Sequence, residues 1–244
     1  MNEWTYHDLL ASLGIGGAHP GGFALTCEVL ERESLGKTSI VLDAGCGTGQ
    51  TAAYLARRFG CDVTALDRHQ LMLQKAANRF RREGVSVRLT QGDIHALPFD
   101  EGTFDLVLVE SVTIFTDIPK ALAEYARVLR RGGILLDLEM TAERPLSAKE
   151  LAELRSVYGT KQVPTETEWK GRLQRAGFGT AEVIKGGTVA SALPGESSPQ
   201  EQFPEYDPSE TIDPQLYDIM NAHQNLTQKY ARRLGYRVYR AARS

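Results

Sequence analysis

Three glycines at alternate positions are the strongest chemical signal in the sequence. They lie at positions 45, 47 and 49 of the stretch Val41-Leu-Asp-Ala-Gly-Cys-Gly-Thr-Gly-Gln50. Because glycine has no Cβ, the backbone there can turn sharply and approach a ligand closely. The spacing is G-x-G-x-G, whereas dinucleotide-binding turns have G-x-G-x-x-G. The stretch also has no lysine like that of a phosphate-binding loop. It therefore predicts a ligand-binding turn of another kind.

Acidic residues follow other apolar runs further along the chain. Asp67 ends the run Cys61-Asp-Val-Thr-Ala-Leu66, Asp93 follows Val85-Ser-Val-Arg-Leu-Thr90, and Glu110 follows an almost wholly apolar stretch. A carboxylate at Asp67 can accept hydrogen bonds from both hydroxyls of a ribose. One at Asp93 can accept from an adenine amino group. Ligands of open α/β sheets bind at the carboxyl ends of the strands, so we expect these acids to surround one site.

The elements that must position these residues alternate along the chain. We expect strands at 39–43, 61–66, 85–90, 104–109 and 134–138, with helices at 50–59, 69–83 and 117–131 between them. This alternation predicts a parallel sheet with helices on both faces. Further helices are expected at 4–13, 22–34, 147–158, 165–176 and 214–233, and further strands at 180–185 and 236–240.

Composition narrows the class of protein. The chain has 244 residues, 42% of them hydrophobic and 24% charged, which is ordinary for a globular protein. A net charge of −3 disfavours a nucleic-acid partner. Three cysteines without C-x-x-C spacing favour neither a disulfide framework nor a zinc site. The start of the chain lacks a signal-peptide core, and no apolar run approaches the ~20 residues needed to cross a bilayer. We therefore expect a cytoplasmic protein with no membrane partner and no metal.

At these positions the sequence resembles the class I S-adenosylmethionine-dependent methyltransferases. It is most similar to the small-molecule branch that includes the quinone-biosynthesis C-methyltransferases. The resemblance covers about residues 39–140 and rests on Leu42-Asp-Ala-Gly-Cys-Gly-Thr-Gly49, Leu66-Asp67, Gly92-Asp-Ile-His-Ala-Leu-Pro-Phe99, Phe104-Asp105 and Val128-Leu-Arg-Arg-Gly-Gly133. It implies a Rossmann-like three-layer α/β/α sandwich. The sheet should have seven mainly parallel strands, with the last strand antiparallel, and helical cap segments should be added to it.

The resemblance also implies a place for each part of the cofactor, S-adenosyl-L-methionine. The backbone of 45–49 would pass under the methionine part, and Asp67 would hold the ribose. Arg68 and Met72 would flank the adenine, and Asp93 with Ile94 would read it. Glu110 and Ser111 would lie near the sulfonium. The expected cofactor-binding residues are Asp43, Gly45, Cys46, Gly47, Gly49, Gln50, Asp67, Arg68, Met72, Asp93, Ile94, Glu110 and Ser111.

The methyl acceptor is less well defined. Many relatives carry a histidine pair just after the fourth strand, where this chain has Ser111-Val-Thr-Ile-Phe115, so the sequence names no catalytic base. We expect Tyr6, His19 and Glu139 to contact the acceptor. The alternatives are that His19 is a turn histidine bonded to backbone, and that Glu139, just past the fifth strand, faces solvent.

We expect residues 1–244 to form a single methyltransferase domain. Its core would be 36–185 and 234–244, and its cap segments would be 1–35 and 186–233. The cap segments carry the aromatic residues Tyr6, Phe23, Phe203, Tyr206 and Tyr217 and would close over the cleft as a lid. Alternatively, they would only cover the sheet edge.

The predicted function is methyl transfer to a small molecule. The alternatives are a non-catalytic module that binds the same cofactor and a nicotinamide-dependent reductase. The oligomeric state stays open.

Overall fold

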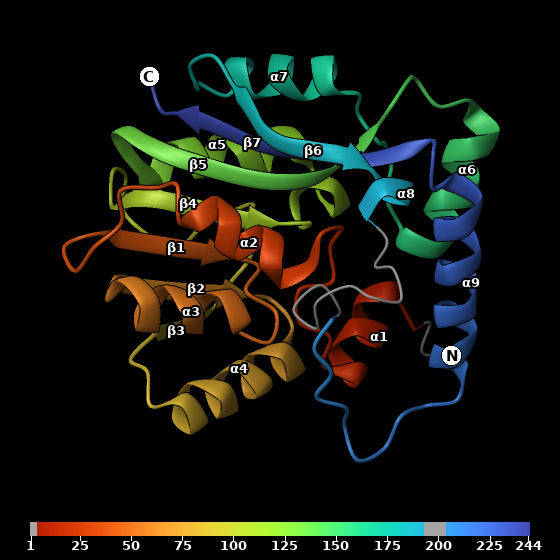
Figure 1. Ribbon diagram of the computed structural model, residues 1–244, viewed down its shortest axis with the longest axis horizontal. Coiled ribbons are helices and arrows are strands. Elements are labelled where there is room, and N and C mark those ends of the chain that lie inside the picture. The colour runs from red at the N-terminus through yellow and green to blue at the C-terminus, as the bar shows by residue number, and fades with distance from the viewer. Residues whose placement is uncertain (1–3, 193–203) are drawn as a thin grey trace.

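The sheet at the centre of the molecule has seven strands in the order β3-β2-β1-β4-β5-β7-β6 (Figure 1). The computed structural model describes residues 4–192 and 204–244. Strands β1 to β5 run parallel, and β7 is antiparallel to both of its neighbours, β5 and β6. The strands are β1 (Ile40–Ala44), β2 (Asp62–Asp67), β3 (Arg88–Gln91), β4 (Phe104–Glu110), β5 (Leu129–Ala142), β6 (Glu182–Thr188) and β7 (Leu234–Ala242). The predicted mainly parallel sheet with an antiparallel last strand is confirmed.

Alternating side chains of the strands build a separate core on each face of the sheet. Val41 and Leu106 pack on the side of α2 (Gly22–Leu30), α3 (Gln50–Phe59) and α4 (Gln70–Glu83). Leu42 and Val107 point the opposite way, because successive side chains of a strand alternate between its faces. They pack on the side of α5 (Ile118–Val128), α6 (Ala148–Tyr158) and α7 (Glu166–Arg175). The two cores confirm the predicted three layers.

Two parts of the chain differ from the expected elements. Helix α5 ends at Val128, and β5 begins at once at Leu129, although the sequence predicted a helix to 131 and a strand of only 134–138. Leu129 pairs with Phe104 of β4, and the register then shifts before Ile134 pairs with Leu106. The short helices η1 (Thr113–Phe115) and α8 (Val189–Ala192) were not predicted.

Helices of both cap segments lie at the carboxyl ends of the parallel strands. These are α1 (Tyr6–Leu13), α8 and α9 (Gln215–Tyr230), and Figure 1 shows them together beyond the tip of β1. Helix α1 packs against α9. It begins at a capping box in which the Thr5 hydroxyl accepts from the Asp8 amide and the Asp8 carboxylate accepts from the Thr5 amide. The division into core and cap stays a prediction. No helix in the described part of the chain is both long and apolar enough to cross a membrane.

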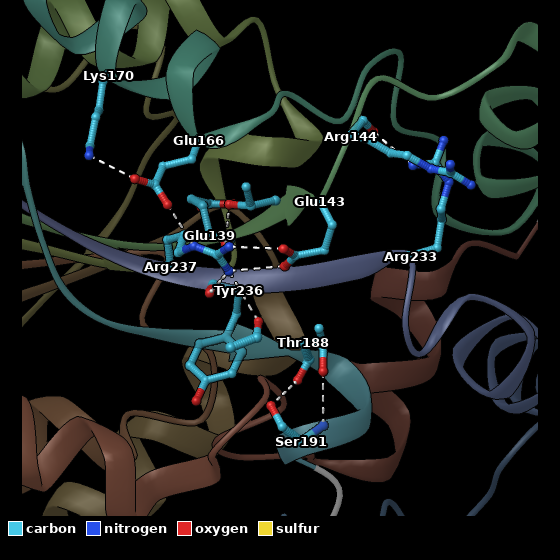
Figure 2. Close-up of polar contacts among 12 residues, drawn as sticks. Glu139, Glu143, Arg144, Glu166, Lys170, Thr188, Ser191, Arg233, Tyr236 and Arg237 are labelled. Atoms are coloured by element: carbon cyan, nitrogen blue, oxygen red, sulfur yellow. Dashed lines mark hydrogen bonds and ion pairs between the residues drawn. The ribbon is translucent and has the colours of Figure 1, made fainter.

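A cluster of charged side chains fixes the junction between the sheet and the cap. Figure 2 shows Arg237 of β7 reaching Glu143, after β5, and Glu166, at the start of α7. Its guanidinium also donates to the carbonyl of Gly187 in β6. Beside it, Arg233 follows α9 and pairs with Glu150 of α6. These ion pairs tie the ends of several elements to the edge of the sheet.

Candidate functional site

A cavity of about 460 Å³ opens at the carboxyl ends of β1, β2 and β4 and extends under the cap helices. All the expected cofactor residues except Gly49 line it. The expected acceptor residues Tyr6 and His19 line it too, whereas Glu139 does not. The structure thus brings together residues that are far apart in the sequence. Their roles in binding stay predictions.

The glycine turn approaches the cavity at Gly47. Its φ is +52°, and a Cβ added there would meet no atom within 4 Å, because that side of the backbone faces the cavity. The amides of Gly45 and Cys46 both donate to the Leu66 carbonyl, at 2.7 and 2.9 Å, which holds the turn against β2. The backbone of the turn is therefore open to a ligand.

Gly49 differs from the expectation, because it packs inward. Its φ is +75°, and an added Cβ would lie 2.7 Å from the Phe80 ring of α4. The residue is needed where α3 begins close to α4, and its Cα does not reach the cavity wall. Its alternate spacing in the sequence suggested a ligand contact, but the packing of two helices accounts for it.

Asp67 couples the end of β2 to the glycine turn. One carboxylate oxygen accepts from the Gly47 amide at 2.9 Å, and the other accepts from the His69 amide at 2.8 Å. Each oxygen has a second lone pair, so the carboxylate can still accept hydrogen bonds from a ligand in the cavity.

Three buried acceptor atoms in the cavity wall have no partner. Asp43 Oδ2, Thr48 Oγ1 and Gln50 Oε1 make no hydrogen bond within residues 4–192 and 204–244. Burial raises the pKa of Asp43 well above its usual value, and the nearby charges of Glu110 and Asp67 raise it further. Unpaired buried polar groups cost free energy. This end of the cavity therefore suits a ligand that brings hydrogen-bond donors and positive charge.

Glu110, at the end of β4, is held by side chains from three elements. Its carboxylate accepts from Thr26 of α2 and, at 2.7 Å, from Thr51 of α3, and it lies 3.2 Å from His19 Nε2. Burial alone would raise the pKa of Glu110. Hydrogen bonds from His19, Thr26 and Thr51, together with the charge of His19, outweigh burial and hold that pKa below its usual value. Glu110 therefore stays ionised, and it adds negative charge to this end of the cavity.

His19 is a turn histidine that also lines the cavity. Its Nδ1 lies 3.3 Å from the Pro20 carbonyl, as the alternative reading expected, while Nε2 faces Glu110 and Thr26. Both ring nitrogens are engaged, so His19 positions Glu110 and has no nitrogen left for an acceptor.

Glu139 was wrongly expected beside the cleft. It lies within β5, is fully buried, and accepts hydrogen bonds from the amides of Val112, Thr113 and Ile114 at 2.7 to 3.1 Å. It neither touches the cavity nor faces solvent. Instead it holds the loop after β4, which begins at Ser111 in a left-handed conformation with φ +56°. Glu139 thus acts on the cavity through the loop that lines it.

The part of the cavity beside the carboxyl ends of β2 and β3 differs from the part around Glu110. Asp93 accepts from the His95 amide at 2.9 Å and pairs with its ring at 2.7 Å; the amide hydrogen bond lowers the pKa of Asp93 most. Arg68 lines the cavity nearby, with the buried side chains of Met72 and Ile94. A flat, apolar group with a hydrogen-bond donor fits this end.

Cys46 has no nucleophilic character in this setting. It is a buried residue, and burial raises the pKa of its thiol well above the usual value, so the thiol stays protonated.

Residues of the cap segments and of the core together form an aromatic wall. Tyr6 of α1 stacks on His223 of α9, with ring centroids 5.1 Å apart, and lies 5.0 Å edge-on to Tyr158 of α6. His7 meets Phe115 edge-on at 4.9 Å. All five residues line the cavity. Sequence reasoning named only Tyr6 among them. Tyr158 and His223 lie on helices distant in sequence, and nothing in the pattern of either helix indicates which side faces a ligand.

Of the other aromatic residues expected in the lid, some line the cavity and some do not. Tyr206 lines the cavity, although it is 58% exposed. Phe23 packs against Tyr54 instead, and Tyr217 is exposed away from the cavity wall. Phe203 lies outside the described residues.

Known proteins resemble the chain in both sequence and fold. The family model described as "Methyltransferase domain" matches residues 41–133. An uncharacterized methyltransferase of Bacillus subtilis, YodH, is 37% identical over 96% of this chain and 97% of its own. The ubiquinone/menaquinone biosynthesis C-methyltransferase UbiE of Idiomarina loihiensis is 38% identical over 44% of each chain. Among solved structures, a Haemonchus contortus phosphoethanolamine N-methyltransferase in complex with S-adenosyl-L-methionine superposes with a TM-score of 0.76 at 20% identity, covering 99% of this chain and 58% of that one.

Proposed function

This chain belongs to the class I S-adenosylmethionine-dependent methyltransferases and methylates a small molecule, and we propose how its cavity divides between the two reactants. S-adenosylmethionine would occupy the part built from the ends of β1, β2 and β4. The acceptor would occupy the part walled by the cap segments. The predicted cap therefore becomes the acceptor-binding part of a single domain.

The buried hydrogen-bond acceptor atoms without a partner are the observation that supports this placement of the cofactor. Asp43 Oδ2, Thr48 Oγ1 and Gln50 Oε1 need donors, and Glu110 adds a charge nearby. An ammonium group supplies such donors, and a sulfonium supplies positive charge. When bound, S-adenosylmethionine supplies a methyl group that its positive sulfur already activates for transfer. The residues present therefore fit the methionine part of the cofactor.

The ribose and adenine of the cofactor would lie along the carboxyl ends of β2 and β3. Asp67 would accept hydrogen bonds from the ribose hydroxyls with its remaining lone pairs. Arg68, Met72, Asp93 and Ile94 would surround the adenine. The similarity to named methyltransferases favours neither alternative, the nicotinamide-dependent reductase or the non-catalytic module that binds the same cofactor.

The acceptor would be an uncharged, largely apolar small molecule. Arg68 is the one arginine or lysine that lines the cavity in the described part of the chain, and within the aromatic wall its charge acts on His7. No arginine or lysine of the described cavity wall is therefore placed beside Tyr6 and His223 to hold a phosphate or carboxylate there. Apolar walls also exclude water, which positions the acceptor and strengthens polar interactions in the site.

The chain would work in the cytoplasm. None of its three cysteines is paired in a disulfide, which supports a reducing compartment. Its net charge of −3 supports a small molecule over a nucleic acid as partner.

A matched pair of variants at the two ends of β2 tests the cofactor site. Asp67→Ala should weaken calorimetric binding of S-adenosylmethionine by about 1–3 kcal/mol, or roughly 5- to 150-fold, because hydroxyls would lose their partner. Asp62→Ala removes an exposed carboxylate at the other end of the same strand and should leave affinity unchanged. Equal affinities for both variants and the parent chain would remove Asp67 from the site.

A further inference from the structure

Two of the five histidines line the cavity with a ring nitrogen to spare. His19 and His95 use both ring nitrogens in contacts with neighbouring groups. His69 lies outside the cavity wall and pairs with Asp8. His7 and His223 remain, and both come from the cap segments. Among the histidines, a group that takes a proton from the acceptor is therefore sought between these two.

His223 has the geometry of an oriented base. Its Nδ1 lies 2.9 Å from the Tyr158 hydroxyl, and Tyr6 stacks on its ring at an interplanar angle of 30°. Within the described ranges 4–192 and 204–244, Nε2 makes no hydrogen bond. When Nδ1–H donates to Tyr158, the Nε2 lone pair is free to accept a proton. Burial lowers the pKa of His223, so the ring is neutral and ready to accept.

His7 is less suited to the same task. Its ring nitrogens make no hydrogen bond to the described residues, so nothing fixes its tautomer. It meets Phe115 only through an aromatic contact. Burial lowers the pKa of His7 most, and the positive charge of Arg68 lowers it further; the charges of Asp67 and Asp8 raise it but do not reverse the shift. A base becomes positively charged when it works, and Arg68 opposes that charge at His7. No arginine or lysine in the described cavity wall stands beside His223.

The surroundings of His223 indicate which acceptor it would serve. Leu10, Phe115, Met140 and Met220 line the same cavity as the Tyr6 and Tyr158 rings. A flat, uncharged molecule can pack between such side chains, while its one polar group meets the imidazole. A hydroxyl on an aromatic ring or a conjugated double bond has this form, and it must lose a proton when it is methylated.

We propose that His223, positioned by Tyr158, accepts the proton from the hydroxyl of a phenol or enol during methyl transfer to its oxygen. The O–H bond breaks, and the proton goes to Nε2. The oxygen electron pair forms the bond to the methyl carbon, while the electrons of the old carbon–sulfur bond stay on sulfur. The imidazolium then returns its proton to water. This assignment rests on the proposed division of the cavity.

Para-substituted phenols of graded acidity test the assignment. The probes are 4-nitrophenol, which ionises easily, and 4-methylphenol, which does not. Near neutral pH, His223→Asn should lower kcat about 100-fold with 4-methylphenol and only a few-fold with 4-nitrophenol, because the acidic phenol needs less help. The loss should shrink as pH rises and free phenol ionises. Tyr158→Phe should shift the same pH profile with a smaller loss.

A second readout does not depend on turnover. With S-adenosylhomocysteine bound, the absorbance of 4-nitrophenol in the site should show more phenolate in the parent chain than in His223→Asn at the same pH. Asn225→Ala changes an exposed residue of the same helix and should match the parent chain in both assays.

The outcomes separate the two proposals. If the parent chain does not bind S-adenosylhomocysteine, the proposed cofactor site fails. If it binds, but methylates 4-nitroaniline or 4-nitrobenzoate in preference to the phenols, or methylates neither phenol, the acceptor class is overturned. If the phenols are methylated and His223→Asn retains the parent pH profile and phenolate fraction, His223 is not the base.

Discussion

Replacing Asp137 by asparagine should remove a pH dependence from the stability of the fold. Asp137 is fully buried in β5, where one oxygen accepts from the Thr113 hydroxyl and the other has no partner among the described residues. Burial raises its pKa from 3.8 to about 7, and Glu139 beside it is raised as well. The folded chain therefore keeps a proton that the unfolded chain loses above about pH 4. Unfolding releases that proton, so stability is greatest below the unfolded pKa and falls as pH rises through the folded pKa.

The size of the effect follows from the shift. Each pH unit between the two pKa values changes the free energy of unfolding by about 1.4 kcal/mol, so the shift of roughly three units amounts to at most about 4 kcal/mol. Asparagine keeps the shape of the side chain and cannot ionise. The stability of Asp137→Asn relative to the parent chain should therefore increase from about pH 5 to about pH 7, by up to roughly 3 kcal/mol.

Urea denaturation at several pH values measures this difference. The slope of free energy against urea must be equal for the two chains, so that the difference reports stability alone. Asp62→Asn removes an exposed carboxylate and should follow the parent chain throughout. A stability difference between Asp137→Asn and the parent chain that is constant with pH would refute the argument.

Three further predictions concern other parts of the structure. Gly49→Ala should lower the thermal stability of the chain by about 1–3 kcal/mol, because of the positive φ and the Phe80 ring, without weakening calorimetric cofactor binding. Arg237→Met should lower the free energy of unfolding in urea by about 1 kcal/mol, since the partly exposed carboxylates of Glu143 and Glu166 lose a shared partner; an unchanged free energy of unfolding would contradict this. In calorimetry, Asp43→Asn should reduce the preference for S-adenosylmethionine over S-adenosylhomocysteine, whose sulfur carries no charge. Binding of the former to the parent chain should release a proton and tighten as pH rises, because positive charge lowers the raised pKa of Asp43; no change in either quantity would count against it.

Prediction from sequence patterns works best for the strands that are buried on both faces. Strands β1 and β4 are short, nearly unbroken apolar runs, and the structure matches them within a residue or so. Strand β5 was missed in part because Arg130-Arg-Gly-Gly133 looks like a turn. Leu129 pairs with Phe104 of β4, and pairing resumes at Ile134, so the stretch lies inside the strand at a register shift; β7 pairs with β5 from Ile134 to Ala142. Long-range pairing of this kind leaves no local pattern.

In the candidate site, too, some residues could be predicted from the sequence and others could not. The placement of Asp67 and Glu110 in the cavity wall could be predicted, because their position at a strand end fixes where they point. His223 could not, since the packing of α9 against α1 and α6 decides which side of that helix faces the cavity. Glu139 did leave a signal: Asp137 and Glu139 alternate with Leu136 and Leu138, which places both acids on one face of a buried strand.

The two parts of the cavity are formed by different stretches of the sequence. All the expected cofactor residues fall between 43 and 111, whereas the aromatic wall around His223 comes mainly from the cap segments on either side. Under the proposed division of the cavity, we expect mutations in the cap segments to alter acceptor choice while methyl-donor chemistry persists. Such a layout suits diversification, because one cofactor-binding core can be combined with many different acceptor-binding segments. Exchanging residues 4–21 and 204–233 between relatives is accordingly a rational starting point for engineering new acceptors.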